Sequence, residues 1–363
     1  MDYFLDKERM PSLLAPFFTL SYPVATPNDP DCFPNATFYD IGYADTCFVV
    51  SLIALLAVLR DGSRLLVLEP FANWKLTRDW RRRNENPKPF ANGKSNGHAT
   101  AGANGSAKSL EQNGVGERLQ LRPDSPEGRH IHRSTLRFAE QGWLTVYYCF
   151  SWSMGLYVNM NLPSDFWSGY PHIPLPGPVK LYYMMQTAFY FHLLLVINAE
   201  APRKDHWQMM THHVISCALI IASYSYNFTR VGCLIMVLMD WCDIVLPLAK
   251  MLRYLSLQVA CDITFGIFLI SWVATRHILF IKVIISAYSD APRLIPFDWI
   301  PERGYYLTHD VYVIFVALLV SLEIIQSIWS YRIFAIAWRV VMGYGADDDR
   351  SDEDDVEDVK KDR

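Results

Sequence analysis

The sequence lacks closely spaced cysteine pairs, and this absence argues against two kinds of site. None of its seven cysteines forms a Cys-x-x-Cys pair, and most of them lie inside apolar stretches. The seven are Cys32, Cys47, Cys149, Cys217, Cys233, Cys242 and Cys261. Neither a disulfide framework nor a zinc site is therefore indicated, and no metal ion is predicted.

The sequence also lacks the histidine boxes of membrane di-iron enzymes. Those enzymes need several His-x-x-His-His and His-x-x-x-His motifs, whereas here His206 is followed six residues later by His212 and His213. Bis-histidine ligation of a haem would need a second imidazole on a facing segment. His192 and His277 are the candidates, but nothing else marks a porphyrin pocket, so no cofactor is predicted.

Long apolar runs are abundant, although polar stretches dilute them to a mean hydropathy of only +0.09. They lie around residues 46–59, 143–160, 179–199, 210–226, 231–249, 263–285 and 311–342. A span needs about 20 mostly apolar residues, and backbone in lipid must satisfy its own hydrogen bonds. We therefore predict an all-α polytopic membrane protein with about seven transmembrane helices. In the first run the charged Arg60 and Arg64 follow the apolar residues, which disfavours a signal peptide.

Charge is segregated along the chain, so the formal net charge of -4 says little by itself. The segment after the first run is rich in lysine and arginine, whereas residues 1–44 carry only Lys7 and Arg9. The positive-inside rule then predicts a lumenal N-terminus and, after seven spans, a cytosolic C-terminus. Lys360 and Lys361 in the final KKDR match a dilysine retrieval signal, which predicts an endoplasmic reticulum membrane protein.

This topology divides the chain into five parts. They are a lumenal N-terminal segment (1–44), a first transmembrane helix (45–60), a cytosolic loop (61–136), a bundle of six helices (137–345) and an acidic cytosolic tail (346–363). Within the loop, residues 84–130 are rich in Gly, Asn, Ser, Ala and Pro. Such a composition cannot bury much apolar surface, so we expect this insert and the tail to be disordered.

Two residues outside the spans are candidates for modification. Asn35 opens the sequon Asn35-Ala36-Thr37 on the predicted lumenal side and is a glycosylation candidate. The sequon at Asn227 lies in a tight turn between two spans, where a transferase would not reach. Ser351 precedes three acidic residues and is a phosphorylation candidate, although the tail also fits a simple solvated run of charge.

Four ionisable residues lie within the predicted spans. Placing an ionisable side chain at membrane depth is energetically unfavourable, so these residues are candidates for function. His212 and His213 occupy the first two turns of the fourth span, in its cytosolic third. Asp240 and Asp243 in the fifth span lie at similar depth and share a helix face, whereas adjacent histidines diverge by about 100°. A carboxylate facing an imidazole fixes its tautomer and stabilises the imidazolium, as a general base or acyl-accepting nucleophile requires. Plain packing is the alternative.

Similarity to a known family is concentrated around these residues. The stretch PRKDHWQMMTHHVISCALIIASYSYNFTRVGCLIMVLMDWCDIVLPLAKMLRYL (202–255) resembles the signature region of the ceramide synthases, the longevity-assurance branch of the TLC-domain membrane proteins. Further similarity lies in RFAEQGWLTVYYCFSWSMGLY (137–157), in TRHILFIK (275–282) and in the acidic tail, which fungal members share. The resemblance implies a TLC-type catalytic bundle with an intramembrane polar cavity for residues 137–345.

The resemblance also implies an activity. Ceramide synthases transfer a fatty acyl group from acyl-CoA to the amine of a sphingoid base, dihydrosphingosine or phytosphingosine. Fatty acyl-CoA would be a co-substrate that arrives from the cytosol, while the sphingoid base is held in the membrane lipid bilayer. His212, by preference, would either remove the amine proton or first accept the acyl group, with Asp240 and Asp243 orienting it. The sequence leaves both routes open.

Four basic residues are candidates for binding substrate. Arg203 and Lys204 at the cytosolic mouth would attract the CoA phosphates, although positive-inside anchoring explains them as well. Arg276 and His277 in the sixth span, like Glu323 in the seventh, would face the bundle interior, either near substrate or as links between helices. The resemblance further implies a small single-span regulatory subunit and is compatible with a homo- or hetero-dimer. No nucleic-acid partner is predicted.

Two other activities compete with this interpretation. A non-enzymatic TLC-domain protein that binds lipid or acts as a membrane-protein chaperone would need no adjacent histidines with matched aspartates. An acyltransferase that acts on a hydroxyl would usually show one buried histidine with a separate Asn or Asp motif. The paired His212 and His213 disfavour both alternatives.

Overall fold

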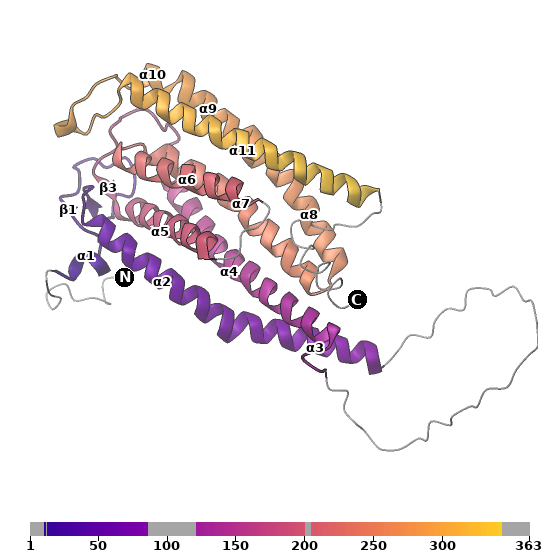
Figure 1. Cartoon of the computed structure of the whole chain (residues 1–363). Helices are drawn as coiled ribbons and strands as arrows, with labels where there is room; N and C mark the ends of the chain where they lie inside the picture. The colour runs from indigo at the N-terminus through magenta and orange to yellow at the C-terminus, as the bar shows by residue number, and fades with distance from the viewer. Residues whose placement is uncertain (1–10, 12, 86–120, 200–204, 343–363) are drawn as a thin grey trace, which may run out of the picture.

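Seven long helical segments dominate the computed structural model, which describes residues 11, 13–85, 121–199 and 205–342 (Figure 1). The first three are α2 (Asp45–Ser63) continued by η1 (Arg64–Leu68) and α3 (Glu69–Glu85), then α4 (Pro126–Asn161) and α5 (Gly177–Ala199). The others are α6 (His206–Ser225), α7 (Thr229–Tyr254), α8 (Gln258–Trp272) continued by η2 (Val273–Leu279) and α9 (Phe280–Ser289), and α11 (His309–Val341). Both η1 and η2 are π-helical stretches that join helices without a break.

Short elements gather at one end of the bundle (Figure 1). They are α1 (Ala15–Phe18), β1 (Pro23–Val24), β2 (Phe38–Tyr39), β3 (Leu175–Pro176), α10 (Ala291–Leu294) and the 3-10 turn η3 (Pro301–Arg303). The three strands form an antiparallel sheet in the order β1-β2-β3, with Val24 opposite Phe38 and Phe38 opposite Pro176. The prediction of an all-α chain is therefore right for the bundle but missed this small sheet.

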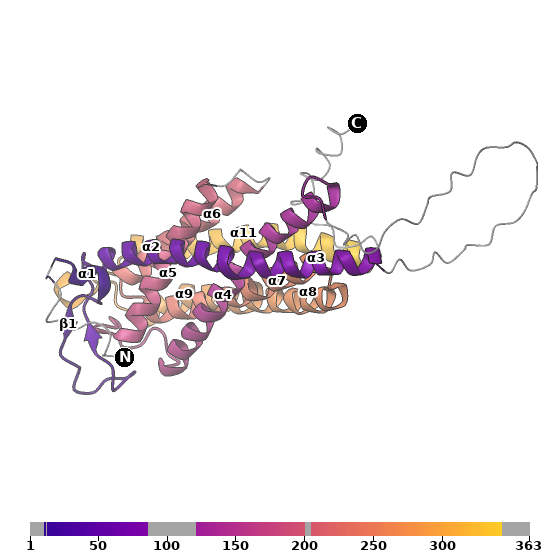
Figure 2. The ribbon, with the colours of Figure 1, turned by 90° about the horizontal axis from the view of Figure 1, so that it is seen from below.

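The bundle is held by close packing of neighbouring helices. α4 packs along α7, α7 along α8, α2 along α5, α5 along α6, and α11 against α6 and α9. Figure 2 shows α2 and α3 as one rod that runs the length of the molecule. Two glycines permit close contact between helices. A Cβ at Gly155 would lie 2.4 Å from the Tyr182 hydroxyl oxygen, and a Cβ at Gly232 would lie 1.8 Å from the Tyr183 hydroxyl oxygen.

Four of the described helical segments are long and apolar enough to cross a membrane. They are Asp45–Glu85, Thr229–Tyr254, Gln258–Leu294 and His309–Arg339. Large apolar side chains on their outer faces are exposed, among them Val58, Ile270 and Ile314, as lipid contact would require. The protein is thus a multi-pass helical membrane protein, while the count of seven spans stays a prediction.

The predicted cytosolic loop is helical at both of its ends. Residues 61–85 continue the first helix through η1 and α3, and residues 126–136 already belong to α4. The first helix therefore extends well beyond residue 60, because its arginine-rich end, Arg78 and Arg81 included, remains a good helix-forming sequence outside the apolar run. Most of the predicted insert at 84–130 and the whole tail at 346–363 lie outside the described residues, and the domain boundaries stay predictions.

Candidate active site

The two adjacent histidines are buried near the start of α6. His212 is 9% exposed and His213 is 5% exposed. Their rings lie 5.2 Å apart but face different neighbours, because successive residues on a helix point about 100° apart. The His212 ring lies edge to face with the Trp329 ring of α11 at 5.0 Å, and the His213 ring lies 5.8 Å from the Tyr190 ring of α5.

Neither imidazole is committed to a hydrogen bond at Nδ1. Both Nδ1 atoms are buried without a partner. Within the described ranges, no three His, Cys, Asp or Glu side chains gather as a metal site would require. The arrangement leaves imidazole nitrogens available for proton or acyl transfer.

Asp240 on α7 ties three helices together. Its side chain is 0% exposed, and its Oδ2 accepts hydrogen bonds of 2.7 Å from Ser151 Oγ on α4 and 2.7 Å from Gln186 Nε2 on α5. Gln186 also donates to the Tyr182 hydroxyl at 3.2 Å. The second carboxylate oxygen, Oδ1, is buried without a partner. Asp240 thus combines a fixed position with one free acceptor.

Asp243, one turn further along α7, pairs with the buried Arg276 of η2. The Arg276 guanidinium donates to Asp243 Oδ2 at 2.9 Å and to the carbonyl oxygen of Met239 at 2.7 Å. Its charge also lies over the Trp272 ring, 5.2 Å from the centroid. Arg276 is 3% exposed, so the prediction that it faces the bundle interior is confirmed, and its contacts link η2 to α7.

His277, next to Arg276 in η2, contacts α11 instead of α7. Its Nδ1 lies 2.6 Å from Glu323 Oε1, and its Nε2 lies 2.6 Å from Ser330 Oγ. Ser330 also accepts a 2.7 Å hydrogen bond from Trp272 Nε1. Adjacent Arg276 and His277 therefore reach different helices from one π-helical stretch, a feature often found at functional sites. These contacts favour a helix-linking role for both residues.

The predicted contact between the aspartates and the histidines is not what the structure shows. Asp240 and Asp243 accept hydrogen bonds from Ser151, Gln186 and Arg276 instead, and neither imidazole donates to them. The Oδ2 atom of each aspartate is already occupied by hydroxyl, amide or guanidinium donors from neighbouring helices. A shared helix face is thus compatible with separate partners, which sequence spacing does not reveal.

Three residues at the site were not predicted to be functional. Tyr190 lies against His213 and within electrostatic range of Asp240, Asp243 and Arg276. Gln186 and Trp329 were not singled out at all. A polar amide within an apolar span was the available signal for Gln186, whereas Trp329 had none in the sequence.

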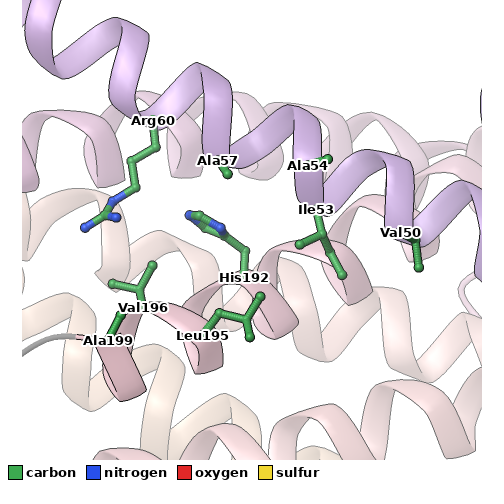
Figure 3. A pocket seen from close by; sticks show the side chains of 9 residues that line it. All are labelled: Val50, Ile53, Ala54, Ala57, Arg60, His192, Leu195, Val196 and Ala199. Atoms are coloured by element: carbon green, nitrogen blue, oxygen red, sulfur yellow. The ribbon is translucent and has the colours of Figure 1, made fainter.

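The predicted polar cavity is not confirmed. One pocket of about 410 Å³ lies between α2 and α5, lined by apolar side chains together with Arg60 and His192 (Figure 3). A smaller one of about 80 Å³ is lined by apolar residues such as Phe228 and Phe315. Neither of these two pockets includes His212 or the aspartates.

The remaining predicted residues are partly described. Asn35 is exposed in a turn ahead of α2. Asn227 is 3% exposed and donates to the Gly304 carbonyl oxygen at 2.9 Å, which agrees with discounting its sequon. Arg203, Lys204 and Ser351 lie outside the described residues.

Comparison with known families decides the identity of the bundle. Residues 137–335 match the TLC domain, the family that groups the TRAM, LAG1 and CLN8 proteins. The chain belongs to the TLC-domain family. That match contains every helix from α5 to α9, and with it all four candidate residues on α6 and α7.

Individual TLC-domain relatives carry informative names. The chain is 40% identical over 227 residues to the sphingosine N-acyltransferase lag1 of Schizosaccharomyces pombe, covering 60% of this chain and 58% of that protein. It is 34% identical over 260 residues to the sphingosine N-acyltransferase-like protein ALT7 of Alternaria alternata, covering 62% and 60%. It is 30% identical over 357 residues to the ceramide synthase FUM18 of Gibberella moniliformis, covering 90% and 71%. The matches thus span about three fifths of the first two relatives.

Proposed function

We propose that this TLC-domain protein is a ceramide synthase, which transfers a fatty acyl group from acyl-CoA to the amine of a sphingoid base. The observation that carries the proposal is the pair of buried imidazoles at the start of α6, unpartnered at Nδ1, in a chain similar to proteins named sphingosine N-acyltransferases. A non-enzymatic lipid-binding protein would have no use for two buried imidazoles whose Nδ1 atoms lack a hydrogen-bond partner.

The chemistry follows from the properties of the two substrates. A sphingoid amine is an ammonium at neutral pH and must lose a proton before its nitrogen attacks a thioester carbonyl. His212 supplies the base for that step or, in the covalent route, attacks the thioester first and then passes the acyl group to the amine. His213, held against Tyr190, shapes the other side of the site.

The two aspartates receive different roles in this proposal. Asp240 carries a free carboxylate oxygen in a fully buried position, so its charge stabilises an imidazolium or an ammonium through space. The charge of Asp243 is balanced by Arg276, and the pair fixes η2 against α7. Arg203 and Lys204, which precede α6 in the sequence, would attract the CoA phosphates through their positive charge.

The setting of the enzyme is part of the same proposal. It places seven spans in the endoplasmic reticulum membrane, with the N-terminus in the lumen and α6 beginning on the cytosolic side. Acyl-CoA then reaches His212 from the cytosol and the sphingoid base from the bilayer. A small single-span regulatory subunit and a homo- or hetero-dimer complete the assembly that we infer from the family resemblance.

Product analysis tests the activity. Membranes that contain the wild type, His212→Ala, His213→Ala or His309→Ala at equal abundance are supplied with long-chain acyl-CoA and dihydrosphingosine, and the amide product is measured. His309 is exposed at the start of α11 and serves as the control. We expect amide from the wild type and control, and its loss from both α6 variants. No amide from the wild type across a range of chain lengths would contradict the proposal.

A further inference from the structure

Trp329 on α11 has a buried hydrogen-bond donor that nothing in the structure satisfies. Its indole Nε1 is inaccessible to solvent and has no partner among the described residues. Three other tryptophans show the usual arrangement, in which Nε1 donates to a serine hydroxyl. These bonds are Trp167 to Ser286 at 2.9 Å, Trp241 to Ser271 at 2.9 Å and Trp272 to Ser330 at 2.7 Å.

Location distinguishes Trp329 from Trp143, whose Nε1 is also unpartnered. Trp143 lies in an apolar cluster with Leu56 and Tyr147, away from the candidate catalytic base. Trp329 instead lies edge to face with His212, with 5.0 Å between the ring centroids. An N–H donor kept without an acceptor costs stability, so its presence beside the candidate base indicates that a ligand supplies the acceptor.

The helix that carries Trp329 is held in place by polar contacts on its adjoining face. Ser330 lies 2.6 Å from His277 Nε2, and Glu323 lies 2.6 Å from His277 Nδ1. Gln326, one turn before Ser330, is 0% exposed and contacts the Met239 sulfur at 3.6 Å. These contacts fix the rotation and the height of α11, so the indole beside His212 has a defined position before any substrate binds.

The direction of charge in acyl transfer shows what a fixed N–H donor would do there. In both routes open to His212, a nitrogen lone pair adds to the thioester carbonyl carbon and the C=O π electrons move to oxygen. The oxyanion then re-forms the carbonyl, the C–S bond breaks, and the thiolate of CoA leaves. In the direct route the amine proton, taken up by His212, passes to the thiolate. In the covalent route the acyl group stays on the imidazole until the amine adds to the same carbonyl carbon, the C–N bond to the imidazole breaks, and the amine proton goes to the released imidazole. An N–H donor beside the carbonyl oxygen interacts more strongly as negative charge develops on that oxygen, so it stabilises the transition state more than the bound thioester.

We propose that Trp329 is a catalytic residue whose indole N–H donates to the thioester carbonyl oxygen as it becomes the oxyanion. The proposal rests on the ceramide synthase activity proposed above and extends it to the last long helix. The two rings are in contact, with centroids 5.0 Å apart, so one carbonyl group that entered the site could reach both, its carbon about 3 Å from the imidazole nitrogen and its oxygen about 3 Å from the indole nitrogen.

The test compares Trp329→Phe with Trp338→Phe in the full-length protein. Phenylalanine keeps an aromatic ring against His212 but removes the N–H, and Trp338, 63% exposed on the same helix, is the matched control. We expect kcat for amide formation to fall about 10²- to 10³-fold in Trp329→Phe, as on removal of one oxyanion donor. KM for acyl-CoA should change less than about threefold, because the interaction is made chiefly in the transition state. Trp338→Phe should match the wild type.

A second replacement isolates the N–H from the shape of the side chain. Placing 3-benzothienylalanine at position 329 exchanges the N–H for sulfur in a ring of nearly equal size. This variant keeps the packing of the indole, so it remains informative if Trp329→Phe fails to fold. A loss of kcat in this variant, at wild-type abundance and melting temperature, supports the proposal. A kcat within threefold of the wild type overturns it and leaves the ceramide synthase activity standing. If the wild type itself makes no amide, both proposals fail.

Discussion

The ion pair between Asp243 and Arg276 provides a quantitative test of how the bundle is held together. The guanidinium is 3% exposed, whereas the Asp243 side chain is 32% exposed. Replacing Asp243 with leucine leaves a buried cation without its counter-charge, although the Met239 carbonyl oxygen and the Trp272 ring still contact it. We expect this variant to lose about 3 kcal/mol of stability, the lower end for breaking a buried pair.

The opposite single variant should be less destabilised. Arg276→Met removes the buried cation and leaves a carboxylate that is partly exposed, for which we expect a loss of about 1–2 kcal/mol. In the double variant Asp243→Leu/Arg276→Met, no charge is left unpaired and two apolar side chains pack together. Its stability should lie within about 1 kcal/mol of the wild type, which implies a strongly non-additive cycle.

The assay is reversible unfolding of the purified protein in mixed micelles, measured for all four members of the cycle. We expect a coupling energy of about 3–5 kcal/mol between the two positions, the sum of the two single losses less the small loss in the double variant. The pair Lys75 and Asp79, four residues apart on α3 and both partly exposed, is the control, with an expected coupling below about 0.5 kcal/mol. Additivity of the two core substitutions within 0.5 kcal/mol would show that the observed contact does not stabilise the bundle.

Three further predictions concern the end of the bundle that we place in the lumen. Lys180 is 0% exposed, and its Nζ lies 2.7 Å from Asp45 Oδ1. Lys180→Met should lower the free energy of unfolding by about 3–5 kcal/mol, measured in the same micelles; an unchanged unfolding midpoint would argue against a buried ion pair. Asn35→Gln should abolish a glycosidase-sensitive mobility shift, and a shift that persists would place the glycan elsewhere. Burial lowers the pKa of His172 to about 4, so its neutral form is favoured on folding, and the melting temperature should fall as pH drops from about 6.5 towards 4. His172→Asn should reduce that fall, and an unchanged pH profile would contradict the assignment.

The fold could be predicted well where it depends on local pattern. The apolar runs long enough to form helices follow from composition. The depth of His212 in the membrane, worked from a rise of about 1.5 Å per residue, stays a prediction. The continuation of the first helix to Glu85 was not predicted, because hydropathy falls after residue 60 although helix propensity does not. The small sheet was missed because strands of two residues leave no periodic signal.

The candidate site divides in the same way. The sequence alone determined that this is a helical membrane protein with adjacent imidazoles on one helix and two aspartates three residues apart on the next, because these properties depend on residue type and spacing along single helices. Only the tertiary structure decided that Asp240 bonds to Ser151 and Gln186, and that Trp329 meets His212. Those contacts join helices far apart in the chain, and they depend on the rotation of each helix about its axis. That rotation is set by packing of the whole bundle, which no local pattern encodes.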